Sequence, residues 1–515
     1  MKNFMIKNCY IAVLCCLIIC LLMEEARANY KEAQTAFRGR DYTKSAPLFF
    51  QAYAYPKDKA MRIKSEWGLA QSLQKMGFMY SASKFYSVIV RRGPKASNPY
   101  FRKALEELGR INNTASLGQS HVVQLFKTQV DPARIPGPAR GFYFYYKGIE
   151  FFRNKKYAKA QDYFQRVPPS SNYHLKAMFH KGVIANLAGR HSRAISYFER
   201  VRTLSREGAE GDWLREQANL NIARVHYETR RYREAIRYYA EINRESENWL
   251  DAIFEAAWAF FLMQNHNSTL GNIHTLQSPF FENRFFPESY ILQAITFLRL
   301  CRYDEVKKSL VKFKDRYRPV LKDVKSFLAA TKNNPKLLFQ TVYDYRAGSL
   351  NKYRSAWAIL DALSRTDSYL EAGRTIRFAD SELARLSRAP RKWRASGLLD
   401  ELETFLRKKK IASRSGVGKR LFDYGKTYYT YLNELSDQTK LINAEMLLGK
   451  VDALRSKLKL DNEGAKKSYN FIGGMKPLNV GQDLEYWPFE GEYWEDELGG
   501  YVYNIDDKCG GAKKK

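Results

Sequence analysis

The sequence is poor in the residues that usually build metal and redox sites. Its 515 residues include seven His and six Cys, and four of those Cys lie at positions 9, 15, 16 and 20, close to the N-terminus. No HExxH pattern occurs, and His174 and His180 stand six positions apart, a spacing that separates them around a helix. We therefore predict that the protein holds no metal and needs no cofactor.

Nucleotide-binding and glycoside-cleaving patterns are also incomplete. Gly416, Gly418 and Lys419 resemble part of a phosphate-binding loop. Arg420 then stands where that loop requires the Ser or Thr that binds magnesium. The four Glu within residues 490–497 could supply paired carboxylates, but a Gly-flanked acidic run is more typical of solvated or ion-paired side chains. We therefore predict no catalytic residues and no enzymatic activity.

Acidic residues are scarce relative to basic ones. The chain has 54 Asp and Glu against 86 Lys and Arg, so its formal net charge is +32. Such an excess predicts an anionic partner. Apolar residues make up 45% of the chain and aromatic residues 14%, which excludes wholesale disorder.

The first 28 residues have the three parts of a secretory signal. Lys2 and Lys7 precede an apolar run over residues 10–23, and Ala26 and Ala28 supply the small residues before a cleavage site. As a helix the apolar run would span about 21 Å, short of a bilayer core of about 30 Å. We therefore predict cleavage after Ala28 and export to the periplasm or the periplasmic face of the outer membrane. A membrane anchor or a lipoprotein signal is the alternative.

Export would change both the cysteine chemistry and the choice of partner. The mature chain would keep Cys301 and Cys509. These two residues could form a disulfide, but we favour a buried helical Cys301 and a free Cys509 in the tail. Nucleic acid is excluded as a partner outside the cytoplasm, whereas peptidoglycan, lipopolysaccharide phosphates and acidic proteins remain.

An internal repeat of 34 residues organises the chain. Its skeleton is a small residue, a second small residue 12 positions later and an aromatic residue 4 positions after that. Seven such units are recognisable between residues 33 and 310. The clearest pair is Gly148, Ala160, Phe164 and Val167, followed by Gly182, Ala194, Phe198 and Val201. The small residues allow the two helices of a hairpin to cross closely, and the aromatic residue fills the next layer.

The pattern resembles the tetratricopeptide repeat, which has Gly or Ala, Ala and an aromatic residue at these offsets. The resemblance covers residues 29–313, with one degenerate unit near 98–130, and it departs at Thr269 and Val306, which replace the second Ala. It implies an all-α fold with a right-handed superhelix of helical hairpins.

Two further segments follow the repeats. Residues 314–465 alternate long amphipathic stretches with short breaks, which predicts a region of long helices. Within it Leu447, Val451, Leu454 and Leu458 form an apolar seam. We interpret the seam as a packed helical layer, with an intermolecular coiled coil as the alternative. Residues 466–515 form an irregular aromatic and acidic tail.

The resemblance also implies a binding groove lined by the first helix of each repeat. This groove would hold an extended or helical segment of a partner protein, or would be filled by the long C-terminal helices. The predicted lining residues are Tyr145, Phe152, Phe179, Asn186, Arg224, Tyr227, Phe254, Trp258, Phe261 and Leu298.

The tail has a charge opposite to the rest of the chain. Residues 477–507 contain nine acidic and no basic residues, among several aromatic ones. We predict that residues 484–503 dock in cis on a basic face, near residues 407–410, with Trp487 and Trp494 buried; docking in trans is the alternative. The expected anchors are Trp487, Phe489, Tyr493, Trp494 and Tyr501.

The tail, together with residues 256–281 and 286–306, is similar to envelope tetratricopeptide proteins of gliding and predatory Gram-negative bacteria. That similarity implies a non-enzymatic scaffold for protein–protein interactions in a cell-envelope assembly, some of which serve surface motility. Two alternatives are a protein that binds peptidoglycan or lipopolysaccharide through its basic surface, and a divergent lytic wall enzyme.

Overall fold

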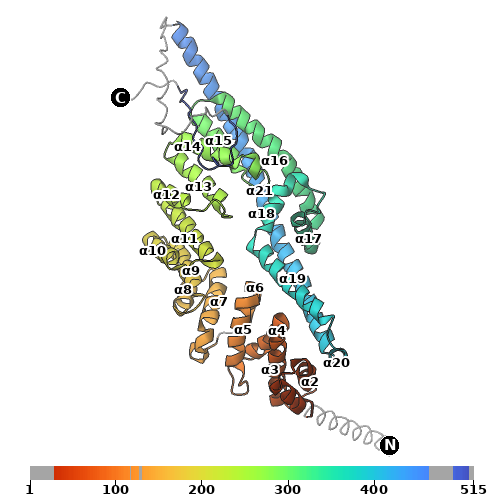
Figure 1. Ribbon diagram of the computed structural model, residues 1–515. Helices are drawn as coiled ribbons and strands as arrows, with labels where there is room; N and C mark the ends of the chain where they lie inside the picture. Colours follow the sequence, from red (N-terminus) through yellow and green to blue (C-terminus); the bar gives the residue numbers. More distant parts are fainter. Residues whose placement is uncertain (1–27, 116, 127–129, 463–490, 510–515) are drawn as a thin grey trace, which may run out of the picture. The chain divides into compact units, whose positions relative to one another are not determined.

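The computed structural model describes residues 28–115, 117–126, 130–462 and 491–509 (Figure 1). Helices and short 3₁₀ turns account for the regular structure in these ranges, which contain no strand. The predicted all-α solenoid is therefore confirmed. Of the helices described, none combines the length and the apolar composition needed to cross a bilayer.

The chain divides into two compact units. The first comprises residues 1–184 and 365–420, and the second comprises residues 185–364 and 421–515. The chain passes from one unit to the other three times: within α9 (His174–Leu187), between residues 364 and 365, and within α21 (Leu398–Asn462). These units cut across the predicted division at residues 313 and 465, because the C-terminal helices pack on the repeats.

In the first unit, residues 28–38 are helical and precede helical hairpins. The further helices of this unit are α2 (Tyr42–Ala54), α3 (Lys59–Lys75), α4 (Met79–Arg91), α5 (Phe101–Ala115), α6 (Gln119–Leu125), α7 (Arg140–Arg153), α8 (Tyr157–Gln165), α19 (Asp367–Leu386) and α20 (Arg391–Ala395).

Close helix crossings explain the small residues of the repeat. A Cβ placed on Gly148 of α7 would lie 2.5 Å from the ring of Phe164 in α8. A Cβ on Gly68 of α3 would lie 2.6 Å from the ring of Phe49 in α2. At both crossings the aromatic ring therefore occupies the space that a larger residue would need.

Helices far along the sequence complete the core of the first unit. Trp393 of α20 is buried, and its indole Nε1 donates to the Thr43 carbonyl at 2.9 Å. The guanidinium of Arg385 lies 4.3 Å from the ring centroid of Phe78. The N-terminal repeats and the α19–α21 segment thus share one hydrophobic core.

Glu382 of α19 caps α4 from 302 positions away in the sequence. Phe78, at the N-cap of α4, has no side chain that can accept a hydrogen bond. The Glu382 carboxylate instead accepts from the Tyr80 amide at 2.6 Å, from the Ser81 amide at 3.0 Å and from the Ser81 hydroxyl at 2.6 Å. Burial raises the pKa of Glu382, and these hydrogen bonds oppose that shift.

The second unit continues the hairpin pattern. Its helices, apart from the shared α9 and α21, are α10 (His191–Leu204), α11 (Ala209–Glu228), α12 (Tyr232–Ala240), α13 (Trp249–Leu262), α14 (His266–Leu276), α15 (Glu288–Arg299), α16 (Tyr303–Thr331), α17 (Pro335–Arg346) and α18 (Trp357–Ser364).

The apolar seam of α21 does not form a packed layer. Leu447, Val451 and Leu454 have exposed fractions of 52%, 43% and 60%, so the interpretation as a packed layer is wrong for these three residues. The side chain of Leu458 lies outside the described residues. Another face of α21 meets α16: a Cβ on Gly449 would lie 2.6 Å from the Tyr303 hydroxyl.

A candidate binding cleft and a docked C-terminal strap

A cleft of about 520 Å³ opens on the repeats of the second unit. It is formed by helices α11, α13 and α15, with one residue from α12. Its lining consists of Arg224, Tyr227, Tyr239, Phe254, Glu255, Trp258 and Glu288. Four of the ten predicted groove residues therefore lie together here: Arg224, Tyr227, Phe254 and Trp258.

An ion pair fixes one side of the cleft. The Arg224 Nε atom donates to both Glu255 oxygens, at 3.0 and 2.9 Å, and its Nη2 atom donates to Oε1 at 2.6 Å. The Tyr239 hydroxyl donates to the same carboxylate at 2.8 Å. Burial alone would lower the pKa of Arg224, but its bond to Glu255 outweighs that effect and raises it. Burial, with the charge of Glu255, raises the pKa of Tyr239.

The aromatic side chains of the cleft are held by neighbours outside it. The ring of Phe254 lies 5.8 Å from that of Phe286, and the ring of Trp258 lies 5.7 Å from that of Phe261 in an edge-to-face arrangement. Phe254, Trp258 and Tyr227 are all half-buried. They present fixed aromatic surface together with solvent access, which is the combination that binding hot spots require.

Glu288 gives the cleft a net acidic character. It accepts a hydrogen bond from the Tyr431 hydroxyl of α21, and the charge of Glu288 together with burial raises the pKa of Tyr431. With Glu255 and Glu288 set against Arg224, the ionised side chains of the lining sum to one negative charge. The cleft is therefore acidic on a chain whose net charge is +32.

The other predicted groove residues lie outside this cleft. Tyr145 is buried and stacks on Tyr173 with ring centroids 5.2 Å apart, so it belongs to the core of the first unit. Phe152 and Phe179 both contact the ring of His180. Tyr145 therefore stabilises the repeat core, whereas Phe152 and Phe179 are half-buried.

Three predicted groove residues of the second unit have other neighbours. Phe261 packs behind Trp258, and Asn186 donates to the carboxylate of Glu228 at 3.0 Å. Leu298 lies beside α21, where it lines a cavity of about 400 Å³ with Leu441. At this end of the groove α21 borders the repeats but leaves this cavity between them, so it does not fill the groove as the alternative predicted.

Residues 491–509, called the strap here, lie against α13–α16 of the same unit. The ring of Tyr493 stacks on His274 with centroids 4.0 Å apart, and the His274 Nε2 atom contacts the Glu492 carbonyl at 2.8 Å. The Gly499 amide donates to the Thr275 hydroxyl at 2.9 Å. Ring stacking and backbone hydrogen bonds therefore hold the strap on α14.

Gly271 is required for the strap to approach α14. A Cβ at this position would lie 1.7 Å from the Tyr501 carbonyl oxygen, so any other residue would displace the strap. The Tyr503 amide donates to the Asn267 carbonyl at 3.1 Å, one turn earlier on the helix. Tyr501 itself is buried.

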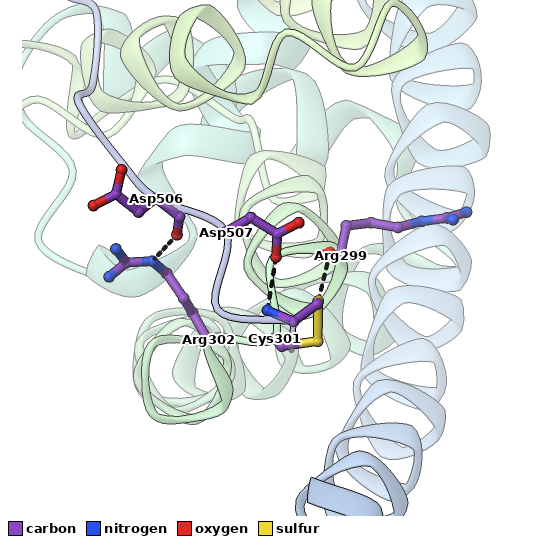
Figure 2. The surroundings of a disulfide bond; sticks show 6 residues. Arg299, Cys301, Arg302, Asp506 and Asp507 are labelled. Atoms are coloured by element: carbon purple, nitrogen blue, oxygen red, sulfur yellow. Dashed lines mark hydrogen bonds between the residues drawn. A yellow bond between two sulfur atoms is a disulfide. The ribbon is translucent and has the colours of Figure 1, made fainter. Parts of the chain in front are cut away.

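A disulfide anchors the far end of the strap. Cys301 and Cys509 are bonded, across 208 positions of sequence. Figure 2 shows Arg302 beside this bond, with its Nε atom donating to the Asp506 carbonyl at 3.0 Å. The preference for a free Cys509 is therefore wrong. Backbone pairing of Lys508 with Leu300, at 3.0 Å, brings the two sulfurs together.

The details predicted for the tail need correction. Trp494 is 57% exposed rather than buried, and Trp487, Phe489 and Glu490 lie outside the described residues. The strap contacts α13–α16, whereas the basic residues proposed as its dock belong to the first unit, where Arg407 pairs with Glu403 and Lys410 with Asp380. The docking position predicted from charge is wrong, because the arginines that contact the strap bind its backbone carbonyls rather than its acidic side chains.

We expect acidification to loosen the strap through His274. Its pKa is lowered chiefly by burial, with Lys312 adding to the shift and Glu492 opposing it. The undocked imidazole would titrate near 6.5, so protonation favours release as the pH falls below that value. Hydrogen exchange of residues 491–509, corrected for intrinsic rates, should therefore quicken between pH 7.5 and pH 5.

His274→Gln, which keeps a donor but cannot ionise, should remove this pH dependence, whereas His191→Gln on α10 should retain it. An unchanged pH dependence in His274→Gln would show that another group governs release.

Sequence reasoning missed several residues of these sites. His274 and Asn267 carry no signal of their role, since their partners lie more than 200 positions away. Gly271 could have been noticed, because a Gly inside a helix often marks a close approach. Glu255 and Glu288 fall outside the predicted groove positions, which lie three before, one after and four after the first small residue of each repeat.

One comparison with known proteins agrees with the repeat pattern. The family model for the tetratricopeptide repeat matches residues 145–209. Among solved structures, the apo form of the quorum sensor NprR from B. thuringiensis aligns with 73% of this chain and 99% of its own, at 13% identity and a TM-score of 0.30. Comparison with curated proteins gives no match.

Proposed function

The chain carries tetratricopeptide repeats, and from this premise we propose that it is an exported, non-enzymatic scaffold that binds other proteins of the cell envelope. The observation that carries the proposal is the open cleft of α11, α13 and α15. It presents Tyr227, Phe254 and Trp258 to solvent beside fixed polar groups. Sites of this size, with aromatic walls and a few positioned polar atoms, are typical of binding sites.

The lining favours a basic partner segment. A Lys or Arg side chain would find aromatic faces for cation–π contact and the carboxylates of Glu255 and Glu288 for ion pairing. An acidic segment would meet those two carboxylates and be repelled. The partner is therefore a protein with an exposed basic and aromatic or aliphatic segment.

Two further observations support the cellular setting. The Cys301–Cys509 disulfide is typical of proteins in oxidising compartments, and the first 28 residues read as a secretory signal. A wall-cleaving enzyme would need paired glutamates in a cleft. Glu495 and Glu497 are instead exposed on the strap, which favours a non-enzymatic role. Envelope assemblies, including those that serve gliding motility, lie in such an oxidising compartment.

Trp258→Ala should weaken partner binding by about thirtyfold, which corresponds to the roughly 2 kcal/mol of a buried aromatic anchor. The test is a crosslinked pull-down with tagged protein recovered from the periplasmic fraction, whose intact mass also reports cleavage after Ala28. The matched control is Leu262→Ala, on the same helix and outside the cleft. Equal capture by both variants with unchanged helical circular dichroism would contradict the role of the cleft.

The net charge of +32 favours contact with peptidoglycan or lipopolysaccharide as a second function. Binding to isolated sacculi would weaken as the salt concentration rises, and Trp258→Ala would leave it unchanged. These two responses distinguish it from binding of a partner protein in the cleft.

A further inference from the structure

A second cavity, of about 300 Å³, lies within the first unit between α6, α19 and α21. It is separate from the cleft described above and from the strap. Hydrogen-bond donors dominate its polar lining. They are His121, Gln124, Ser368, Thr375, Lys409, Ser413 and Arg420. Glu371 of α19 is the one carboxylate among the described residues that line it.

The basic side chains of this cavity make no direct polar contact. Within the described ranges, the side chains of Lys409, His121 and Arg420 take part in no ion pair and no hydrogen bond. The adjacent Lys410 behaves differently, since it pairs with Asp380. Lys409 and His121 are both at least half-withdrawn from solvent, so their missing partners carry a free-energy cost.

The titration behaviour of these groups agrees with a positive site that Glu371 compensates only in part. Burial lowers the pKa of Lys409 to about 8, with Arg91 adding to the shift and Glu371 opposing it. Burial, together with Lys409 and Arg91, lowers the pKa of His121 to about 3. The free protein thus holds positive charge at this place against both desolvation and mutual repulsion. An anion would remove both penalties.

We propose that this cavity binds the phosphoryl group of a small organic phosphate. An ammonium, a guanidinium, an imidazole and three hydroxyls, on three separate helices, suit the several oxygens of a phosphoryl group better than a single planar carboxylate. The rest of the lining includes Leu117, Ala372 and Val417, which supply apolar surface for the organic part. The site stands on residues of the first unit and does not depend on the proposed scaffold function.

The probe for this site is phenyl phosphate, titrated into the full-length mature protein by isothermal calorimetry at fixed ionic strength. We expect saturable binding, and Lys409→Met should weaken it at least about tenfold, which equals about 1.4 kcal/mol. Lys408→Met is the matched control, because it removes the same charge one position earlier, on an exposed side chain outside the lining. This control should bind as the unaltered protein does.

Stability measurements keep the test independent of misfolding. Lys409→Met removes a buried charge, so its melting temperature without ligand should equal or exceed that of the unaltered protein. It should lose the rise that phenyl phosphate gives to the unaltered chain and to Lys408→Met. Arg420→Met should also weaken binding.

Four results would overturn the proposal. The first is no saturable binding of phenyl phosphate at millimolar concentration, and the second is equal affinity in Lys409→Met and Lys408→Met. The third is equal binding of benzoate, which would assign the site to carboxylates. Inorganic phosphate should bind more weakly than phenyl phosphate, and the reverse order would contradict a site for an organic phosphate.

Discussion

Replacing both Cys301 and Cys509 by Ser is expected to lower the free energy of unfolding of the second unit by about 3–5 kcal/mol. The disulfide joins residues 208 positions apart, so its loss frees a very long loop in the unfolded chain. It also leaves the strap held by ring stacking and a few backbone hydrogen bonds. Differential scanning calorimetry should show a fall in melting temperature of roughly 5 °C or more.

Reduction provides the control for this prediction. Unaltered protein treated with a reductant should melt at the temperature of the double Ser variant, and the variant should not respond to reductant. If the oxidised protein and the double variant melt together, the strap draws no stability from the disulfide.

Replacing Glu382 by Ala is expected to destabilise the first unit by about 2–4 kcal/mol. The carboxylate satisfies the amides of Tyr80 and Ser81 at the start of α4, and both amides are buried. Removal leaves two donors without acceptors in the core, each at a cost of about 1–3 kcal/mol. Urea unfolding followed by circular dichroism measures the loss.

Asp380→Ala provides a matched comparison on the same helix. Its partner Lys410 lies near solvent, and the pair should contribute about 1 kcal/mol or less. Glu382→Gln should fall between the two Ala variants, because its amide keeps one acceptor oxygen. Equal stability of Glu382→Ala and Asp380→Ala would show that Glu382 does not cap α4.

The repeats could be predicted from the sequence because their contacts are local. Gly148 and Phe164 meet across one hairpin, 16 positions apart, and the same pattern of residue sizes recurs 34 positions later at Gly182 and Phe198. The identity of the fold therefore followed from a pattern of residue sizes with a fixed period. The polar turn between the helices reinforced it.

Contacts over long sequence distances could not be predicted in the same way. The cap of α4 by Glu382 and the stacking of Tyr493 on His274 each join segments more than 200 positions apart, and no period connects them. Opposite charge indicated that the tail docks. The place of docking depends instead on ring stacking, on the space left by Gly271 and on backbone carbonyls, none of which charge patterning encodes.

The sequence predicts some residues of the binding cleft, because they lie at fixed positions of the repeat. The repeat pattern selects one face of the first helix of each repeat. That face contains Tyr227, Phe254 and Trp258. Whether that face stays open depends on what packs over it. Tyr145 is covered by its own repeat neighbours, and α21 borders Leu298, so the same offsets select core residues elsewhere.

Site-specific photo-crosslinking in living cells tests the scaffold function most directly. The photoreactive residue p-benzoyl-phenylalanine would replace Tyr227 in the cleft or, as a control, the exposed Leu262 on α13. The account predicts a discrete adduct with another protein from position 227, lost in the Trp258→Ala background, and none from position 262. Absence of any adduct at position 227, or the same adducts from both positions, would contradict it.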